Sequence, residues 1–276
     1  MPDNQFRDLD QLPQFPAVAT KLLRVLSHDD AHVAEIANFV RADAALASGL
    51  LRMANSALYA RPARVTSIQG ALSLLGFEEV KRYVLATSMK GCFQSAVRLD
   101  LLRAIWRHSL TCALLAEELS TACSATAGRD DQAYTSGLLH NIGRLGLFVA
   151  YPAQYAALLD EKGAGGAMLE REKRAFGVDH AEAGEYLARK WELPDAVRVA
   201  AATHHQAPGG EPFDAANVTR VAVLLADALG LDVTPAPEPP TVQAIRAMLP
   251  RAAQYRFDPD AAALKRRITD RLDAFD

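Results

Sequence analysis

The sequence contains little cysteine, few aromatic residues and no excess of positive charge. Its three cysteines, Cys92, Cys112 and Cys123, form no CxxC pair, so neither a disulfide framework nor a structural zinc site is indicated. Aromatic residues make up 7% of the chain, and 30 Lys and Arg stand against 33 Asp and Glu, a net charge of −3. Nucleic-acid-binding proteins usually carry a basic surface and base-stacking aromatics, so nucleic acid is not expected as a partner.

Long apolar runs are also missing. The N-terminal residues have neither the basic stretch nor the apolar core of a signal peptide. The apolar run from Val221 to Leu231 is interrupted by Asp227 and is much shorter than a membrane span. The sequence therefore predicts a cytoplasmic protein that does not bind a membrane.

Helix-forming residues dominate what is present. Alanine occupies 52 of the 276 positions, and alanine gives up no side-chain entropy in a helix. Apolar residues recur at helical spacing, and no convincing alternating β pattern is found. We therefore predict an all-α fold. The predicted helices cover 18–26, 33–40, 44–56, 66–75, 77–89, 99–123, 132–149, 152–162, 167–176, 179–191, 194–204, 215–229, 241–248 and 259–274.

Two breaks in composition divide the chain into three segments. Residues 91–100 separate two helical blocks, so we predict an N-terminal helical lobe over 1–95 and a second lobe over 96–234. The run Pro235-Ala-Pro-Glu-Pro-Pro240 is too rich in proline for a helix interior and predicts a hinge. Residues 235–276 then comprise this hinge and the C-terminal helices. One continuous helical domain is the alternative.

The distribution of the seven histidines is the most informative feature. His28 and His32 lie in a polar, acidic turn that is typical of solvated surface, whereas the other five lie in helical segments or at helix ends with apolar neighbours. Asn141 and Asp227 likewise interrupt apolar stretches. A buried carboxylate or imidazole costs several kcal/mol unless it is paired or bound to a metal ion. These positions therefore require partners.

Imidazole nitrogens and carboxylate oxygens are common ligands of zinc, iron and manganese. Spacing alone leaves two interpretations open, a divalent-metal site or a set of buried, hydrogen-bonded imidazoles. No other cofactor is indicated. The candidate metal ligands are His108, His140, Asn141, His180, His204, His205 and Asp227.

The order of these seven residues resembles the HD phosphohydrolase superfamily. The first block of the chain is more specific, because its motifs resemble the HDOD family, the HD-related output domain of bacterial signalling proteins. The likeness covers roughly residues 10–230, and it implies an N-terminal helical bundle followed by an HD-like helical lobe that contains the metal site. The motifs are Leu12-Pro-Gln-Phe-Pro16, Val33-Ala-Glu-Ile-Ala37, Arg41-Ala-Asp-Ala-Ala-Leu46, Leu50-Leu-Arg-Met-Ala-Asn-Ser-Ala-Leu-Tyr59 and Ser67-Ile-Gln-Gly-Ala-Leu-Ser-Leu-Leu-Gly76.

The departures from the superfamily pattern bear on activity. Asn141 stands where active members have an Asp that bridges two metals and helps to activate water. Ala104 stands where three-metal relatives of the HD-GYP type have a Glu, and their Gly-Tyr-Pro signature is absent. Arg144 keeps a cation one turn after His140, where relatives have a Lys that can contact a phosphate. The resemblance thus implies a degenerate metal site.

These departures favour a non-catalytic signalling or regulatory module that acts by binding a protein or a small ligand. A signalling protein is the expected partner, and a nucleotide or phosphate is the expected small ligand. The alternative is a divergent metal-dependent phosphohydrolase, or phosphodiesterase, that acts on a nucleotide or cyclic dinucleotide. Asn141 supports the first hypothesis, while the retained histidines and Asp227 support the second.

Overall fold

The structure is a computed structural model that describes residues 6–12, 14–16, 19–20, 33–59, 64–92, 99–123, 131–160, 168–210, 213–234 and 238–275. Within these residues every regular element is helical and no strand occurs, so the predicted all-α class is confirmed. His28, His32 and most of the helix predicted over 18–26 lie outside the described residues. None of the described helices combines the length and hydrophobicity that a membrane-spanning helix requires.

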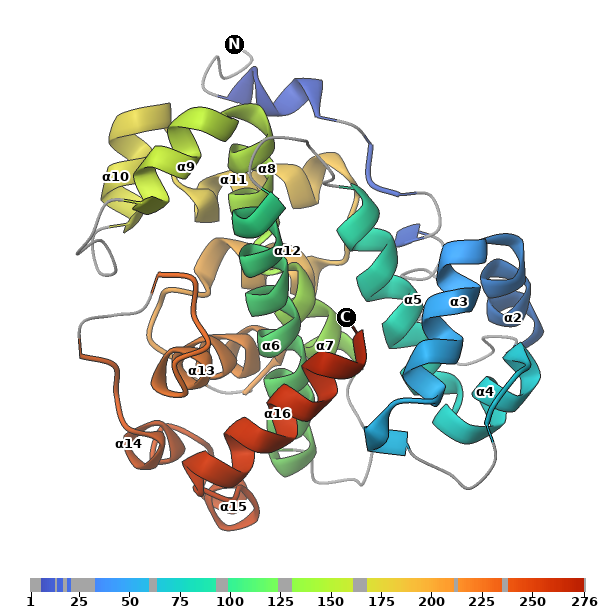
Figure 1. Cartoon of the computed structure of the whole chain (residues 1–276). Helices are drawn as coiled ribbons and strands as arrows, with labels where there is room; N and C mark the ends of the chain where they lie inside the picture. The colour runs from blue at the N-terminus through green and yellow to red at the C-terminus, as the bar shows by residue number, and fades with distance from the viewer. Residues whose placement is uncertain are drawn as a thin grey trace. The chain divides into compact units, whose positions relative to one another are not determined.

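The helices follow the predicted order closely (Figure 1). Two short 3-10 turns, Leu9–Gln11 and Ala57–Tyr59, accompany them. The helices are α2 (Val33–Ala42), α3 (Ala44–Ala54), α4 (Ile68–Leu75), α5 (Phe77–Cys92), α6 (Leu99–Cys123), α7 (Asp131–Leu139), α8 (Ile142–Ala150), α9 (Pro152–Asp160), α10 (Met168–Phe176), α11 (His180–Lys190), α12 (Asp195–Thr203), α13 (Ala215–Ala228), α14 (Val242–Arg246), α15 (Arg251–Arg256) and α16 (Ala261–Phe275).

Side-chain caps fix several of the helix starts. Asp43, which directly precedes α3, accepts hydrogen bonds from the backbone N–H groups of Ala45 and Leu46. Asp179 and Glu182 form a reciprocal capping box at the start of α11. The second of these caps matters for function, because it fixes the start of the helix whose first residue is His180.

The chain divides into two compact units. One unit comprises Met1–Pro13 and Phe93–Lys265, and the other comprises Gln14–Cys92 and Arg266–Asp276. In the second unit, apolar residues of α2, α3 and α5 form the core, among them Ile36, Leu50 and Val84, which are fully buried. The functional segments predicted over 1–95, 96–234 and 235–276 stay predictions.

In the first unit α6 packs on α7 and α13, while α8 packs on α11 (Figure 1). The prediction of one helix over 132–149 is wrong, because this stretch forms α7 and α8 with a turn at His140 and Asn141. The ring of His140 donates from Nδ1 to the carbonyl of Gly137 at 2.7 Å. It therefore competes for the carbonyl to which the backbone N–H of Asn141 would donate in a continuous helix.

Candidate functional site

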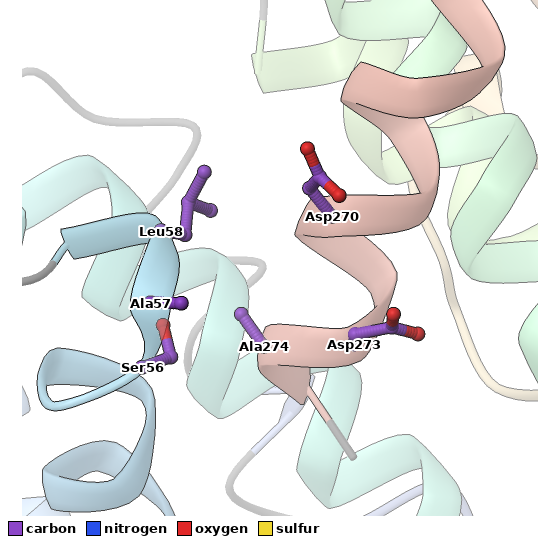
Figure 2. A pocket seen from close by; sticks show the side chains of 6 residues that line it. All are labelled: Ser56, Ala57, Leu58, Asp270, Asp273 and Ala274. Carbon is purple, nitrogen blue, oxygen red and sulfur yellow. The ribbon is translucent and has the colours of Figure 1, made fainter.

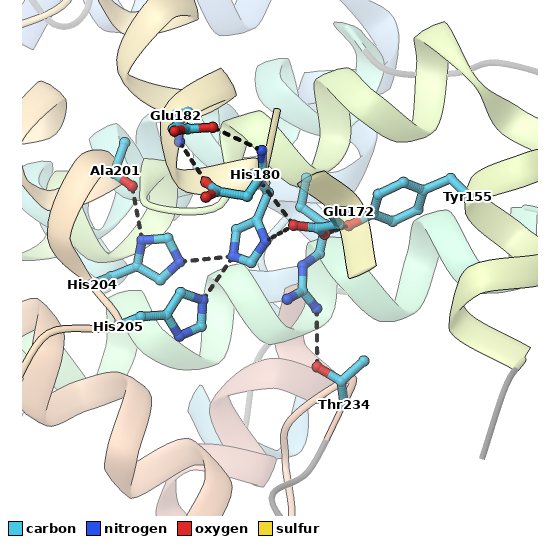
Figure 3. A network of polar contacts seen from close by, with 10 residues as sticks. Tyr155, Glu172, His180, Glu182, Ala201, His204, His205 and Thr234 are labelled. Atoms are coloured by element: carbon cyan, nitrogen blue, oxygen red, sulfur yellow. Dashed lines mark hydrogen bonds and ion pairs between the residues drawn. The ribbon is translucent and has the colours of Figure 1, made fainter. Parts of the chain in front are cut away.

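All five histidines of the first unit lie in one cluster, although they come from four separate parts of the chain, and four of them are buried. His108 lies in α6, His140 in the turn between α7 and α8, His180 at the first position of α11, and His204 and His205 directly after α12. The ring centroids of His140 lie 5.5 Å from those of His108 and 4.9 Å from those of His204. The ring centroid of His180 lies 5.2 Å from that of His204 and 4.8 Å from that of His205. Figure 3 shows the part of this cluster around His180.

Two glycines allow the helices that carry these histidines to approach closely. A Cβ atom on Gly143 would lie 1.9 Å from the carbonyl oxygen of His180 and 2.3 Å from the backbone nitrogen of Gly184. A Cβ atom on Gly137 would lie 2.8 Å from the carbonyl oxygen of Cys112. Only a residue without a side chain fits at either position, so α8 lies directly against α11, and α7 against α6.

Hydrogen bonds fix the position of the ring proton in four of the histidines. Nδ1 of His108, His140 and His204 faces the carbonyl of Leu231 at 3.3 Å, of Gly137 at 2.7 Å and of Ala201 at 2.9 Å, respectively. Nδ1 of His180 lies 2.6 Å from the carboxylate of Glu172. Carbonyls and ionised carboxylates only accept hydrogen bonds, so each Nδ1 carries the proton and a neutral ring keeps its lone pair on Nε2.

The Nε2 atoms of three histidines lie close together. Nε2 of His180 is 3.1 Å from Nε2 of His204 and 2.7 Å from Nε2 of His205. Three nitrogens that each lie about 2.1 Å from one metal ion are separated by roughly 3.0–3.4 Å, so this spacing is close to that of a ligand set. The lone pairs of His180 and His204 face one another and repel, and a bound cation relieves this repulsion. A neutral His205 ring can instead carry its proton on Nε2 and donate to His180, and it gives up that proton position when it binds an ion. The donor set therefore fits a divalent ion.

Burial and repulsion between neighbouring rings keep three of the histidines, His140, His204 and His205, neutral. Burial, followed by repulsion from neighbouring histidines, lowers the pKa of His140 and of His204 well below the usual value. Part of the His205 side chain reaches solvent, but its ring faces His180 and Arg144, and burial followed by these two neighbours lowers its pKa to about 3. Neutral imidazole is the form that binds metals.

Three buried polar atoms within one turn have no hydrogen-bond partner. They are Nε2 of His140, Oδ1 of Asn141 and Nε of Arg144, and the three side chains are at most 3% exposed. Buried polar atoms are nearly always hydrogen-bonded, so unpartnered atoms at neighbouring positions indicate a missing ligand. Two of these atoms are acceptors that suit a cation, and the third is a donor that suits an anion.

Two carboxylates that sequence reasoning did not identify lie next to the histidines. Burial raises the pKa of Glu172, but His180 and Arg144 outweigh it and bring that pKa to about 2. Burial likewise raises the pKa of Asp232, and His108 and Arg144 bring it to about 2. Both groups are therefore ionised at neutral pH. Arg144 stays charged between them, and its Nη1 donates to Oγ1 of Thr234 at 3.3 Å.

The seven predicted ligands differ in their placement. Possible metal-binding groups among the described residues are His108 with Cys112 and His140, and His180 with His204 and His205. Asn141 adjoins the first group through His140. Asp227 is half-buried in α13 and belongs to neither of these two groups. Cys112 enters the first group because its Sγ lies 3.6 Å from Nε2 of His108, but burial, followed by Asp232, raises the pKa of its thiol well above the usual value.

A hollow in the second unit has different chemistry. It has a volume of about 520 Å³ and is lined by Ser56, Ala57 and Leu58 on one side and by Asp270, Asp273 and Ala274 of α16 on the other (Figure 2). Its ionisable lining groups are two carboxylates, and no imidazole or cation lines it. Among the described residues, the histidine cluster is thus the stronger candidate for a functional site.

The chain is similar to known proteins over most of its length. The family model of the HDOD domain matches residues 12–207. A curated protein of Treponema pallidum (strain Nichols), named "Uncharacterized protein", is 27% identical over 203 residues, which are 72% of this chain and 39% of that protein. The chain therefore spans about two fifths of the length of this curated relative.

Three solved structures share the fold. An HDOD domain protein of unknown function from Geobacter sulfurreducens matches with a TM-score of 0.78 and 22% identity, over 97% of this chain and 93% of that one. "Putative signal transduction protein" from Marinobacter aquaeolei VT8 gives 0.72 and 21%, over 100% and 62% of the two chains. "Putative phosphohydrolase" from Shewanella amazonensis SB2B gives 0.71 and 22%, over 98% and 96%.

Proposed function

The chain belongs to the HDOD domain family, and from this premise we propose that it is a non-catalytic regulatory module whose histidine cluster binds a divalent metal ion. The bound ion and Arg144 together form a binding site for a phosphate-bearing small ligand, such as a nucleotide. A signalling protein that binds the helical surface detects whether this site is occupied. The site lies in the second of the two lobes that the sequence predicts.

One observation carries the non-catalytic assignment, namely the amide at Asn141. Its Oδ1 is buried and has no hydrogen-bond partner, so it is available as a ligand, but it brings no negative charge. A bridging carboxylate would hold two cations by its charge as well as by its two oxygens. The amide of Asn141 has no negative charge and only one oxygen that can bind a cation. The site is therefore suited to one ion.

The charges around the cluster agree with a single ion. Metal-bound imidazoles are neutral, so the charged groups beside them are Arg144, Glu172 and Asp232, whose charges sum to −1. One divalent ion changes this sum to +1, which suits a phosphate anion, whereas two ions would leave +3 among buried groups. Uncompensated charge in a desolvated site is costly, so a second ion is disfavoured.

The residues that would hold the ion are His180, His204 and His205, whose Nε2 atoms already lie together. When bound, the ion supplies Lewis acidity and a positive charge for an anionic ligand. Arg144 supplies a second charge and the unpartnered Nε–H donor. These groups bind and orient a phosphate, while the amide of Asn141 does not add the charge needed to hold a second ion.

The second candidate function is a divergent metal-dependent phosphohydrolase. The observation that favours it is the survival of all five histidines and of a buried cation in an arrangement that still faces one centre. In this reading Asp232, which lies among His108, His140 and Arg144, replaces part of the charge that Asn141 does not supply.

The deciding experiment has two steps. Protein purified without chelator is analysed for Fe, Mn and Zn, and the same sample is assayed with Mn²⁺ on bis-phenyl phosphodiesters, cyclic dinucleotides and nucleoside monophosphates. We expect about one equivalent of metal per chain and no turnover above that of a His140→Ala control.

Absence of metal, even after incubation with Mn²⁺ or Zn²⁺, would contradict the proposed metal site. Turnover that Mn²⁺ stimulates and that both His140→Ala and Asp232→Ala abolish would contradict the non-catalytic assignment and establish the phosphohydrolase instead. An Asp227→Ala variant assayed in parallel shows which of the two aspartates supports that activity.

A further inference from the structure

Glu172 is a buried carboxylate in a helix whose other charged residues are mostly exposed. It lies in α10, where Glu170, Lys173 and Arg174 face solvent, yet its own side chain has no exposed surface. A carboxylate without water must be stabilised by hydrogen-bond donors from the protein. Its donors come from α9 and from the first residue of α11.

Both carboxylate oxygens of Glu172 are already engaged. Oε1 accepts a hydrogen bond from the hydroxyl of Tyr155. Oε2 accepts two, from the backbone N–H of His180 at 2.8 Å and from Nδ1 of its ring at 2.6 Å (Figure 3). Glu172 is therefore arranged to hold His180 and not to bind a metal ion itself.

The bond to Nδ1 determines what His180 presents to the cluster. An ionised carboxylate accepts but cannot donate, so the ring proton is held on Nδ1 and the lone pair on Nε2 faces His204 and His205. The bond from the same oxygen to the backbone N–H of His180 fixes the ring relative to the start of α11. A carboxylate on the far side of a ligating imidazole also increases the basicity of the nitrogen that binds the metal.

We propose that Glu172 is a positioning residue for His180, and that Tyr155 holds Glu172 in place from α9. This inference rests on the proposed metal site. It adds a chain of contacts, Tyr155 to Glu172 to His180, through which the α9–α10 region sets the affinity of the site for a divalent ion.

The test compares Glu172→Gln with Glu170→Gln. Both substitutions remove one negative charge from α10 and leave side-chain size unchanged, but only the first touches His180. Co²⁺ affinity is measured by titration of visible absorption, and ¹⁵N NMR of the metal-free proteins reports which ring nitrogen of His180 carries the proton. A thermal melt of each variant shows that it is folded.

We expect Glu172→Gln to weaken Co²⁺ binding by about tenfold or more, since loss of such an outer partner typically costs 10–100-fold. Its His180 signal should shift from a single Nδ1–H form towards a mixture of the two tautomers. Glu170→Gln should change neither readout. Tyr155→Phe, which keeps the charge of Glu172, should weaken binding in the same direction by a smaller factor, and it serves if Glu172→Gln does not fold.

The outcomes separate this inference from the proposed function. If the parent binds no Co²⁺, the proposed metal site is wrong, and the NMR comparison alone decides whether Glu172 fixes the tautomer of His180. If the parent binds Co²⁺ and Glu172→Gln binds it equally well, or if the His180 tautomer is the same in both proteins, the positioning role is wrong while the metal site stands.

Discussion

Both compact units bury ionisable side chains, but the two units satisfy them in different ways. In the unit that contains α2–α5, the buried carboxylate of Glu79 accepts from the hydroxyl of Tyr59 at 3.2 Å. It also lies 3.4 Å from Nη2 of Arg271 and 3.6 Å from Nη1 of Arg82. Hydrogen-bond donors and cations of the same unit thus stabilise the Glu79 carboxylate.

In the histidine unit the Nδ1 atoms that face away from the cluster are satisfied, whereas several atoms that face into it are not. The Nδ1 atoms of His108, His140, His180 and His204 all have acceptors. The Nε2 atom of His140 and Oδ1 of Asn141 have no partner, and other Nε2 atoms face one another. Burial of an ionisable group therefore does not by itself mark a site. The feature that distinguishes the histidine cluster is a set of inward-facing lone pairs without a hydrogen-bond donor in the chain.

The largest effect is expected from removing one inward-facing nitrogen. His204→Ala deletes an Nε2 that lies 3.1 Å from that of His180, and Co²⁺ affinity should fall on the order of 100-fold or more, beyond the loss caused by an outer partner. Ser109→Ala is the matched control, because Ser109 is 2% exposed, adjoins His108 and has an unpartnered Oγ. Equal affinities in a Co²⁺ titration of the two variants would remove the distinction drawn between the units.

A charge removed from the other unit should change stability and leave metal binding unaltered. Glu79→Gln breaks the contacts with Arg271 and Arg82, and we expect the free energy of unfolding to fall by about 2 kcal/mol. Glu78→Gln is the control, since Glu78 is 44% exposed although its partner Lys81 is only 6% exposed, and we expect a smaller loss of stability than for the buried Glu79. Urea unfolding measures both, and a change in Co²⁺ affinity in Glu79→Gln would show that the units are not independent in this respect.

Adding the negative charge that Asn141 lacks should increase the difference between the two units. Asn141→Asp places a carboxylate where the amide oxygen is now buried without a partner, and we expect Mn²⁺ or Fe²⁺ to bind about tenfold more tightly. The comparison is a competition titration of parent and variant at the same pH. Unchanged affinity would mean that the position no longer faces the bound ion.

Much of the fold was predictable because its signals are local. Helical spacing of apolar residues placed most helices within a few residues of their observed bounds. The helix predicted over 132–149 was wrong because its apolar pattern continues through His140 and Asn141, while the turn there depends on a ring-to-carbonyl bond that composition does not reveal. The short helix α15, which follows Pro250, was also missed.

The histidines of the site were predictable for a different reason, since imidazoles in apolar segments are conspicuous in any sequence. Glu172 was not, because it lies among alternating charges that are typical of a solvated helix, and its burial depends on Tyr155 and His180. Asp232 lies in the loop after α13, outside any regular helical pattern, whereas Asp227 interrupts an apolar run within that helix. A sequence pattern draws attention to the residue that interrupts it, whereas the electrostatics of the histidine cluster depend on which carboxylates lie beside it in the fold.

The last expected effect is the pH dependence of stability. In metal-free protein the pKa values of His140 and His204 lie well below those of the unfolded chain, at about 6.5, so the unfolded state binds more protons below that pH. The free energy of unfolding should therefore fall as the pH drops from 7 to 5, on the order of 1 kcal/mol for each of these two histidines. Glu172 and Asp232, with pKa values of about 2, lose their stabilising effect only below about pH 4.5, so the change in stability between pH 7 and pH 5 comes from the histidines.

Urea unfolding in the presence of a chelator at pH 7, 6 and 5 measures the slope of stability against pH. His204→Gln should show a shallower slope than the parent. Parallel slopes for the parent and His204→Gln would show that this ring is not held neutral in the folded protein.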